Sequence, residues 1–244
     1  GNESVNNVDQ LGLNYNRVNT NTFRFKPSLI WRAYSGSIGS LGLSYENIIV
    51  EETEGRYIEG NDSIPGYLFN ANQFAGVHGR YEYSNADNVA YPTVGLETII
   101  ELGFKSNVDQ INRNFVYVIP EVSIAQKLEE SGKLVIATRL KGHINFNNNI
   151  EFYQAAAIGG IDGLRGYRNR RFTGKQSYYQ NTDLRYSFRR IKTTVLPVRL
   201  GLYAGFDYGR VWVDNENSNT WHTSYGGGLF VNAADLMSIN FGLF

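Results

Sequence analysis

The sequence has 244 residues, of which 42% are hydrophobic and 14% aromatic, and its 23 basic and 23 acidic residues cancel to a formal net charge of zero. This balance gives no bulk field that would attract nucleic acid, so we expect no nucleic-acid partner. Cysteine is absent, which excludes disulfides, thiolate metal sites and cysteine nucleophiles. No apolar run approaches the roughly 18 residues that a transmembrane helix needs.

Alternation of apolar and polar residues begins after an Asn-rich, aperiodic stretch, residues 1–21, which we expect to be a loop. In the first predicted strand, residues 23–33, apolar residues such as Phe23 and Trp31 alternate with basic ones such as Arg24 and Arg32. The same period of two predicts nine more strands, at residues 39–51, 73–83, 93–105, 114–128, 133–146, 179–189, 196–213, 219–231 and 237–244.

The strand at residues 133–146 has the clearest pattern. One face carries Leu134, Ile136, Leu140, Ile144 and Phe146, and the other carries Lys133, Arg139, Lys141, His143 and Asn145. So basic a face is unsuited to the dry core of a small sandwich. The pattern therefore favours a sheet between lipid and a wet lumen over a soluble β-sandwich binding module.

The connections between strands differ in length in a regular way. Long ones, at residues 1–21, 52–72 and 147–178, belong to one rim, together with the shorter 106–113 and 214–218. Short ones, at 34–38, 84–92, 129–132, 190–195 and 232–236, belong to the other. Long outer loops and short periplasmic turns are typical of outer-membrane barrels. Aromatic residues near strand ends suit interfacial girdles: Trp31, Phe104, Phe115, Phe146, Trp212, Trp221 and Tyr225. We predict an all-β fold, a single antiparallel transmembrane β-barrel domain over residues 1–244.

The connection at 147–178 contains an ordered set of motifs. Gly159-Gly160 is followed by Leu164-Arg165-Gly166-Tyr167, and a downstream strand reads Phe206-Asp207-Tyr208-Gly209. This set resembles the outer membrane protein 85 superfamily of BamA/TamA-like assembly barrels and two-partner secretion transporters. In that superfamily an arginine motif of the form (V/I/L)-R-G-(F/Y) lies on an extracellular loop that folds into the barrel, and residues 164–167 match it at every position.

The resemblance implies a sixteen-strand barrel, of which about ten strands are found here. It also implies that the first five strands, the closing strand and the periplasmic polypeptide-transport-associated domains lie outside this sequence. An open sheet would have two unpaired edges, which a bilayer does not tolerate. We therefore expect these residues to be part of a longer protein.

Arg165 needs a carboxylate partner if it is held inside a barrel, because burying an unpaired guanidinium costs several kcal/mol. By the predicted alternation, Asp207 faces the lumen and is the preferred partner, and Asp183 on the preceding strand is the second candidate. Gly166 would let the backbone turn sharply, and Tyr167 would pack beside the pair.

The sequence gives little support for enzymatic chemistry. His78, His143 and His222 lie on three strands without metal-ligand spacing, so no metal and no cofactor are expected. Glu97 and Glu101 share a face, where hydration or a salt bridge to a neighbouring strand is the favoured interpretation over a catalytic pair. Residues 226–228, three glycines, lack the lysine and helix of a phosphate loop and more simply permit bending or close packing.

The resemblance implies a non-enzymatic outer-membrane protein that inserts or translocates polypeptides. Its implied partners are outer-membrane lipid, client outer-membrane or secreted polypeptides, and accessory lipoproteins. An alternative remains open: a passive pore, or a barrel that anchors a separate and possibly enzymatic domain.

Overall fold

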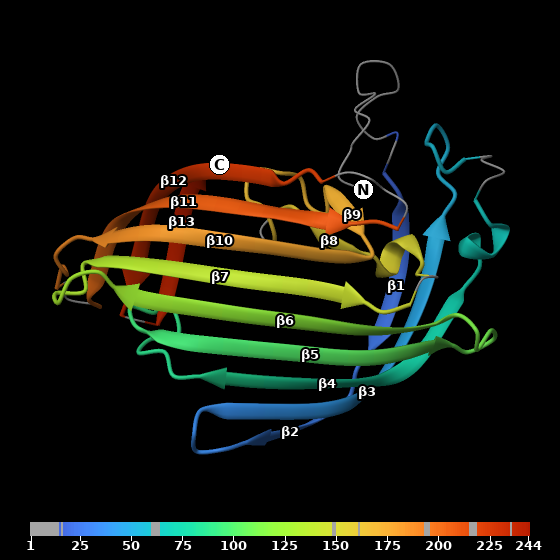
Figure 1. Ribbon diagram of the computed structural model, residues 1–244, viewed down its shortest axis with the longest axis horizontal. Coiled ribbons are helices and arrows are strands. Elements are labelled where there is room, and N and C mark those ends of the chain that lie inside the picture. The colour runs from blue at the N-terminus through green and yellow to red at the C-terminus, as the bar shows by residue number, and fades with distance from the viewer. Residues whose placement is uncertain are drawn as a thin grey trace.

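The computed structural model describes residues 15, 17–59, 64–147, 150–160, 162–192, 196–214, 219–234 and 236–244. Most of the loop predicted at residues 1–21 lies outside this set. The described residues form one curled antiparallel sheet of eleven strands and a two-stranded hairpin inside its curve (Figure 1). The predicted all-β antiparallel fold is therefore confirmed.

Neighbouring strands of the sheet are mostly consecutive in the chain, so most of them are joined as hairpins. Only β7 and β10 are neighbours separated by the small hairpin, which consists of β8 (Ala156–Ile158) and β9 (Phe172–Gly174). The sheet strands are β1 (Asn19–Phe25), β2 (Ser28–Arg32), β3 (Ser37–Glu51), β4 (Asn72–Ser84), β5 (Gly95–Asn107), β6 (Asn114–Lys127), β7 (Leu134–Asn145), β10 (Gln176–Ser187), β11 (Val198–Trp212), β12 (His222–Ala233) and β13 (Met237–Leu243).

The first predicted strand, residues 23–33, is present as β1 and β2, which both pair with β3. Arg24 pairs with Glu46 and Ser28 pairs with Gly42, so the register continues unbroken from β1 to β2. Pro27 interrupts the ladder because proline has no N–H to donate, although its carbonyl still accepts a hydrogen bond from the Leu43 N–H at 3.0 Å. β1 and β2 therefore together occupy the place of a single strand beside β3.

The two faces of the sheet differ as the alternation predicts. Large exposed apolar side chains gather on the convex face, including Leu41, Leu43, Val77, Leu102, Ile124, Leu184, Leu202 and Leu229. On the concave face, Arg139 and Lys141 of β7 both pair with Glu121 of β6, at 2.9 and 3.1 Å. An apolar outside and a charged inside are the arrangement of a transmembrane barrel wall. Within the described residues the sheet is open, since β1 and β2 pair with β3 and β13 pairs with β12.

The placement of Phe115 in the interfacial girdle is wrong. Its side chain is buried on the concave face, where it stacks on Tyr117 at 6.1 Å and packs edge-on against Phe74 at 6.0 Å. Residues 115 and 117 are two apart on β6 and share a face, so alternation overrides the position at a strand end. The other predicted girdle aromatics are exposed, namely Trp31, Phe104, Phe146, Trp212, Trp221 and Tyr225.

Candidate functional site: the inward-folded loop

The long connection between β7 and β10 lies against the concave face. A 3-10 turn, η2 (Phe152–Gln154), leads into strands β8 (Ala156–Ile158) and β9 (Phe172–Gly174), which pair with each other. The hairpin contacts β7, β10 and β11 and lies inside the curve of the sheet (Figure 1). The residues between β8 and β9 form the tip of the loop, and they include the arginine motif.

Two glycines of the motif allow the tip to fold this tightly. Gly159 has φ +120°, and a Cβ there would lie 2.4 Å from the carbonyl oxygen of Arg168. Gly166, directly after Arg165, has φ +84°, a left-handed conformation that disfavours any residue with a Cβ. Between them, the N–H of Gly160 donates to the Leu164 carbonyl at 3.1 Å and closes the turn.

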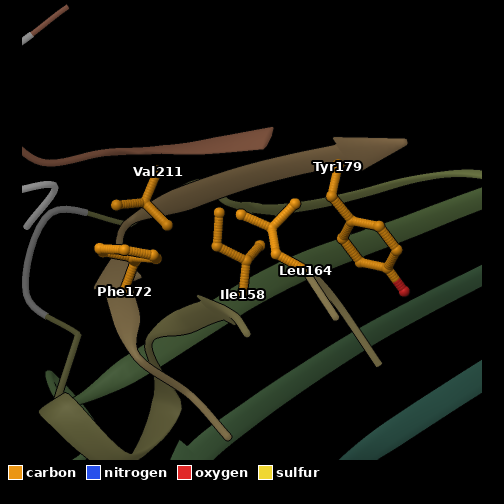
Figure 2. Close-up of a cluster of buried hydrophobic side chains, with 5 residues drawn as sticks. All are labelled: Ile158, Leu164, Phe172, Tyr179 and Val211. Atoms are coloured by element: carbon orange, nitrogen blue, oxygen red, sulfur yellow. The ribbon is translucent and has the colours of Figure 1, made fainter. Parts of the chain in front are cut away.

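Leu164 fastens the tip to the wall through a small apolar core. Its fully buried side chain packs in one cluster with Ile158 and Phe172 of the hairpin, and with Tyr179 of β10 and Val211 of β11 (Figure 2). Burying a leucine side chain contributes about 1.5–3 kcal/mol. The cluster therefore holds the loop inside before any charge is considered.

Tyr167 adds a second attachment, towards β12. Its ring packs edge-on against Phe172 at 5.3 Å, and its hydroxyl donates to the backbone carbonyl of Thr223 at 3.1 Å. Phe172 in turn stacks on His222, with ring centroids 3.6 Å apart. The loop is thus tied to three consecutive strands of the wall.

Arg165 is placed by these attachments directly against Asp207 of β11. Its Nη2 lies 2.5 Å and its Nε 2.9 Å from the two carboxylate oxygens, and its backbone N–H also donates to Asp207, at 2.9 Å. Ser224 of β12 donates a further hydrogen bond to the same carboxylate, at 3.3 Å. Asp207 is completely buried. Because a buried carboxylate is costly unless paired, this bidentate contact is the strongest constraint on the position of the loop.

Asp183 of β10, the second predicted partner, also contacts the guanidinium, since its Oδ1 lies 2.8 Å from Nη2 of Arg165. Its other oxygen lies 3.3 Å from Nη2 of Arg185. Two arginines and two aspartates therefore alternate in one network, and their formal charges cancel. The structure brings both predicted carboxylates to the same guanidinium rather than choosing between them.

Phe244 covers the guanidinium from the remaining side. The Cζ atom of Arg165 lies 4.0 Å from the centroid of this ring, within the range of a cation–π contact. The ring has room because Gly205 and Gly226 lie beneath it: a Cβ on either would come within 2.7 Å of a Phe244 atom. Gly226 thus has the close-packing role expected for the three-glycine segment. The sequence analysis missed Phe244 because nothing local links it to residue 165.

The root of the loop is held by Arg113, which lies between β5 and β6 and was also missed. Its Nη2 lies 2.8 Å from Glu151 and donates to the Asn72 side chain at 2.9 Å. Its guanidinium lies 4.3 Å from the centroid of Tyr67, whose hydroxyl donates to Glu151 at 3.2 Å. Three connections of one rim therefore meet at Arg113. No sequence motif marks this residue.

The remaining candidates do not converge on one site. His78 lies beside Ser28, with its Nε2 2.9 Å from the hydroxyl, and His143 packs edge-on against Tyr117. Glu101 accepts a hydrogen bond from the Tyr117 hydroxyl at 3.1 Å. Among the described residues, no group of three or more His, Cys, Asp and Glu side chains is arranged to hold a metal ion.

No helix within the described part of the chain is both long enough and apolar enough to cross a membrane.

The class of protein follows from this geometry and from the sequence. A curled antiparallel sheet with an apolar convex face encloses an inward-folded loop with an arginine motif, and this is the arrangement that the resemblance to the outer membrane protein 85 superfamily implies. The sequence model of one of its families, the haemolysin secretion/activation proteins ShlB/FhaC/HecB, matches residues 103–231, more than half of the chain. The chain belongs to this family.

Solved structures show the same fold. BamA from Haemophilus ducreyi, in a form lacking POTRA domains 1–3, superposes with a TM-score of 0.64 over 91% of this chain at 18% sequence identity. The chain spans 53% of the length of that protein. A search of curated proteins gives no match.

Proposed function

We propose that this chain is the barrel portion of an outer-membrane protein that translocates polypeptides across the outer membrane or inserts them into it, and that it has no enzymatic activity of its own. The observation that carries the proposal is the family match over residues 103–231, which contains the entire inward-folded loop together with Asp183 and Asp207. Because the family is named for secretion and activation of haemolysin, we favour translocation of a secreted polypeptide.

The fixed position of the loop supports this role. A passive pore needs a lumen that is open at rest, whereas here the lumen holds a hairpin fastened by Arg165 and Leu164. The cations and acids of the concave face, such as Lys141 and Glu121, give the lumen a wet and charged lining. The proposed partners are a client polypeptide inside the barrel and outer-membrane lipid against the convex face. Accessory lipoproteins stay a prediction from the resemblance.

The test compares the native host carrying the full-length protein with a host carrying R165A. Quantitative proteomics of the culture medium and of the outer-membrane fraction would measure the outcome, after a check that the variant barrel is present in equal amount. We expect one or a few polypeptides to be lost from the medium. Loss of barrel proteins from the outer membrane instead would indicate insertion. No change in either fraction would contradict the proposal, and altered uptake of small solutes would then indicate a passive pore.

A further inference from the structure

The connection between β4 and β5, predicted as a short turn of the rim, is folded by hydrogen bonds from its own side chains. The carboxylate of Asp87 accepts hydrogen bonds from the N–H groups of Thr93 at 2.8 Å and Val94 at 3.1 Å. The side-chain oxygen of Asn88 accepts one from the Tyr91 N–H at 2.8 Å. These bonds give residues 85–94 a defined shape, and that shape directs Tyr91 away from the rim.

Tyr91 crosses the concave side of the sheet to reach β12. Its ring stacks on Phe230 with centroids 4.7 Å apart and planes 28° apart. The guanidinium of Arg185, on β10, lies 5.2 Å from the centroid of the same ring. Only 3% of Tyr91 and 1% of Phe230 are exposed. A tyrosine of a rim turn is therefore as deeply buried as a core residue.

The receiving wall is shaped for an aromatic ring. The Phe230 ring lies over Gly201 of β11, where a Cβ would meet the ring at 2.1 Å. Because Gly201 has no side chain, Phe230 can pack closely against β11. The guanidinium of Arg185 lies beside the ring that stacks on Phe230. A planar apolar base with a cation beside it binds aromatic rings through stacking and cation–π attraction. We call this arrangement of Phe230, Gly201 and Arg185 the aromatic socket.

The socket lies on the same three strands as the attachments of the long loop, β10, β11 and β12, but nearer the opposite rim. Successive connections of an antiparallel sheet lie at opposite rims. The β4–β5 turn, which contains Tyr91, therefore lies at the rim opposite the β7–β10 loop. A cavity of about 420 Å³ separates the turn from Arg165, and its lining includes Tyr91, Asp183, Tyr203 and Asn240. The loop bounds this chamber from one rim, and the Tyr91 turn bounds it from the other.

We propose that the aromatic socket is a binding site for an aromatic side chain, that Tyr91 is its tethered occupant, and that this contact closes the lumen at the rim opposite the long loop. Release of Tyr91 opens the chamber at this rim. The empty socket then accepts an aromatic side chain of another polypeptide segment that enters the lumen. The proposal concerns closure of the lumen and does not depend on the direction in which a client moves.

The first test measures ion conductance of the full-length protein in planar lipid bilayers, with Y91A compared to wild type. Val89 supplies the matched control, because it belongs to the same turn but is fully exposed. We expect the open fraction of Y91A to rise roughly tenfold. The stacking of one aromatic ring, with a cation beside it, changes the equilibrium constant between the closed and open states by about a factor of ten. V89A should behave as wild type. Equal open fractions for Y91A and V89A, both shown to be folded, would overturn the proposal.

Competition by a free ring then tests the socket itself. p-Cresol has the ring and hydroxyl of a tyrosine side chain and should raise the open fraction of wild type in a saturable way, because it displaces Tyr91 from Phe230 and Arg185. Its saturated counterpart, 4-methylcyclohexanol, has similar bulk but no π face and should have no such effect. Neither compound should change Y91A, which has no tethered ring to displace. If both compounds act equally on wild type, the ring is not recognised and the assignment of the socket fails.

A cross-link keeps the test valid if Y91A fails to fold. Ala90 and Ser238 both line the chamber, and the sequence contains no cysteine. The pair A90C and S238C, bridged by a bis-methanethiosulfonate reagent, would hold the turn in its closed position with Tyr91 intact. We expect the bridged protein to conduct less than the unbridged one and to recover after reduction. Unchanged conductance on bridging would contradict closure by this turn.

Discussion

Among the described residues, Arg165 makes the contacts that do most to hold the inward-folded loop in place. It donates to a fully buried aspartate through both its side chain and its backbone, contacts a second aspartate and lies under an aromatic ring. Removing either member of such a pair leaves the other without its partner in a place where water screens poorly. The consequences of substitution are therefore specific enough to be measured.

We expect R165A and D207A each to lower the free energy of unfolding by roughly 2–5 kcal/mol. The double variant should cost less than the sum of the two, because neither charge is then left unpaired. Denaturant titration of the protein in detergent micelles or liposomes would measure the three values. Strictly additive effects would show that the two residues do not interact energetically.

D183A can be compared with the R165A and D207A variants in the same unfolding experiment. Asp183 shares its carboxylate between Arg165 and Arg185, and Arg165 keeps its bidentate contact with Asp207 when Asp183 is removed. We therefore expect D183A to cost less than D207A in the same titration. A larger cost for D183A would mean that Asp207 is not the principal partner.

At the scale of single elements, β7 gives the sharpest test of which face meets lipid. Leu140 lies on the convex face in the middle of the strand, and the neighbouring Lys141 pairs with Glu121 on the concave face. An arginine facing the bilayer midplane costs about 2–4 kcal/mol, so L140R should lower the free energy of unfolding by that amount. K141Q should cost less than about 1 kcal/mol, because Arg139 remains to pair with Glu121. Equal effects would contradict the register.

The β4–β5 turn provides a prediction with a defined dependence on pH. Burial raises the pKa of the Asp87 carboxyl, but hydrogen bonds from the Thr93 hydroxyl and from the Val94 and Thr93 N–H groups outweigh burial and leave the pKa below its usual value. The stability that this carboxylate contributes is complete above about pH 4 and is lost as the pH falls through the lowered pKa. D87A should therefore be less stable than wild type at neutral pH, by about 1 kcal/mol.

The difference in stability between wild type and D87A should become smaller as the pH falls below about 4, because the wild-type carboxylate is then protonated. Unfolding midpoints of the two proteins at several pH values would show this convergence. E130A, in the exposed turn between β6 and β7, serves as the control. A gap independent of pH would mean that the charge of Asp87 has no part in holding the turn.

The strands could be predicted from the sequence because alternation is a local property of each segment. The period of two placed every strand of the large sheet and both faces of β7, and the arginine motif indicated the loop and its aspartate partners. Contacts between remote segments could not be predicted in this way. Phe244 over Arg165, Arg113 beside Glu151, and Tyr91 on Phe230 join residues that no shared motif connects. Phe115 was misplaced because its position at a strand end was weighted above its alternation.

As a whole molecule, the protein presents an apolar convex face that has no counterpart on the concave side. We expect extraction of the protein from membranes to require detergent. The folded protein should migrate differently from the heated protein on a denaturing gel, because its hydrogen-bonded sheet resists the detergent until it is heated. A monodisperse monomer in buffer without detergent would contradict a membrane-spanning role for this face.

The network around Asp183 joins the two ends of the lumen. One of its oxygens contacts Arg165 of the long loop and the other contacts Arg185, whose guanidinium borders Tyr91. A change that frees the loop takes Arg165 away from Asp183, which also pairs with Arg185, and a change that frees Tyr91 takes the ring away from Arg185. We therefore expect the two changes to be coupled through Asp183. Thermodynamic linkage makes such an effect reciprocal: if release of one end favours release of the other by some factor, the reverse holds by the same factor. We therefore expect release at one end of the lumen to change the equilibrium at the other.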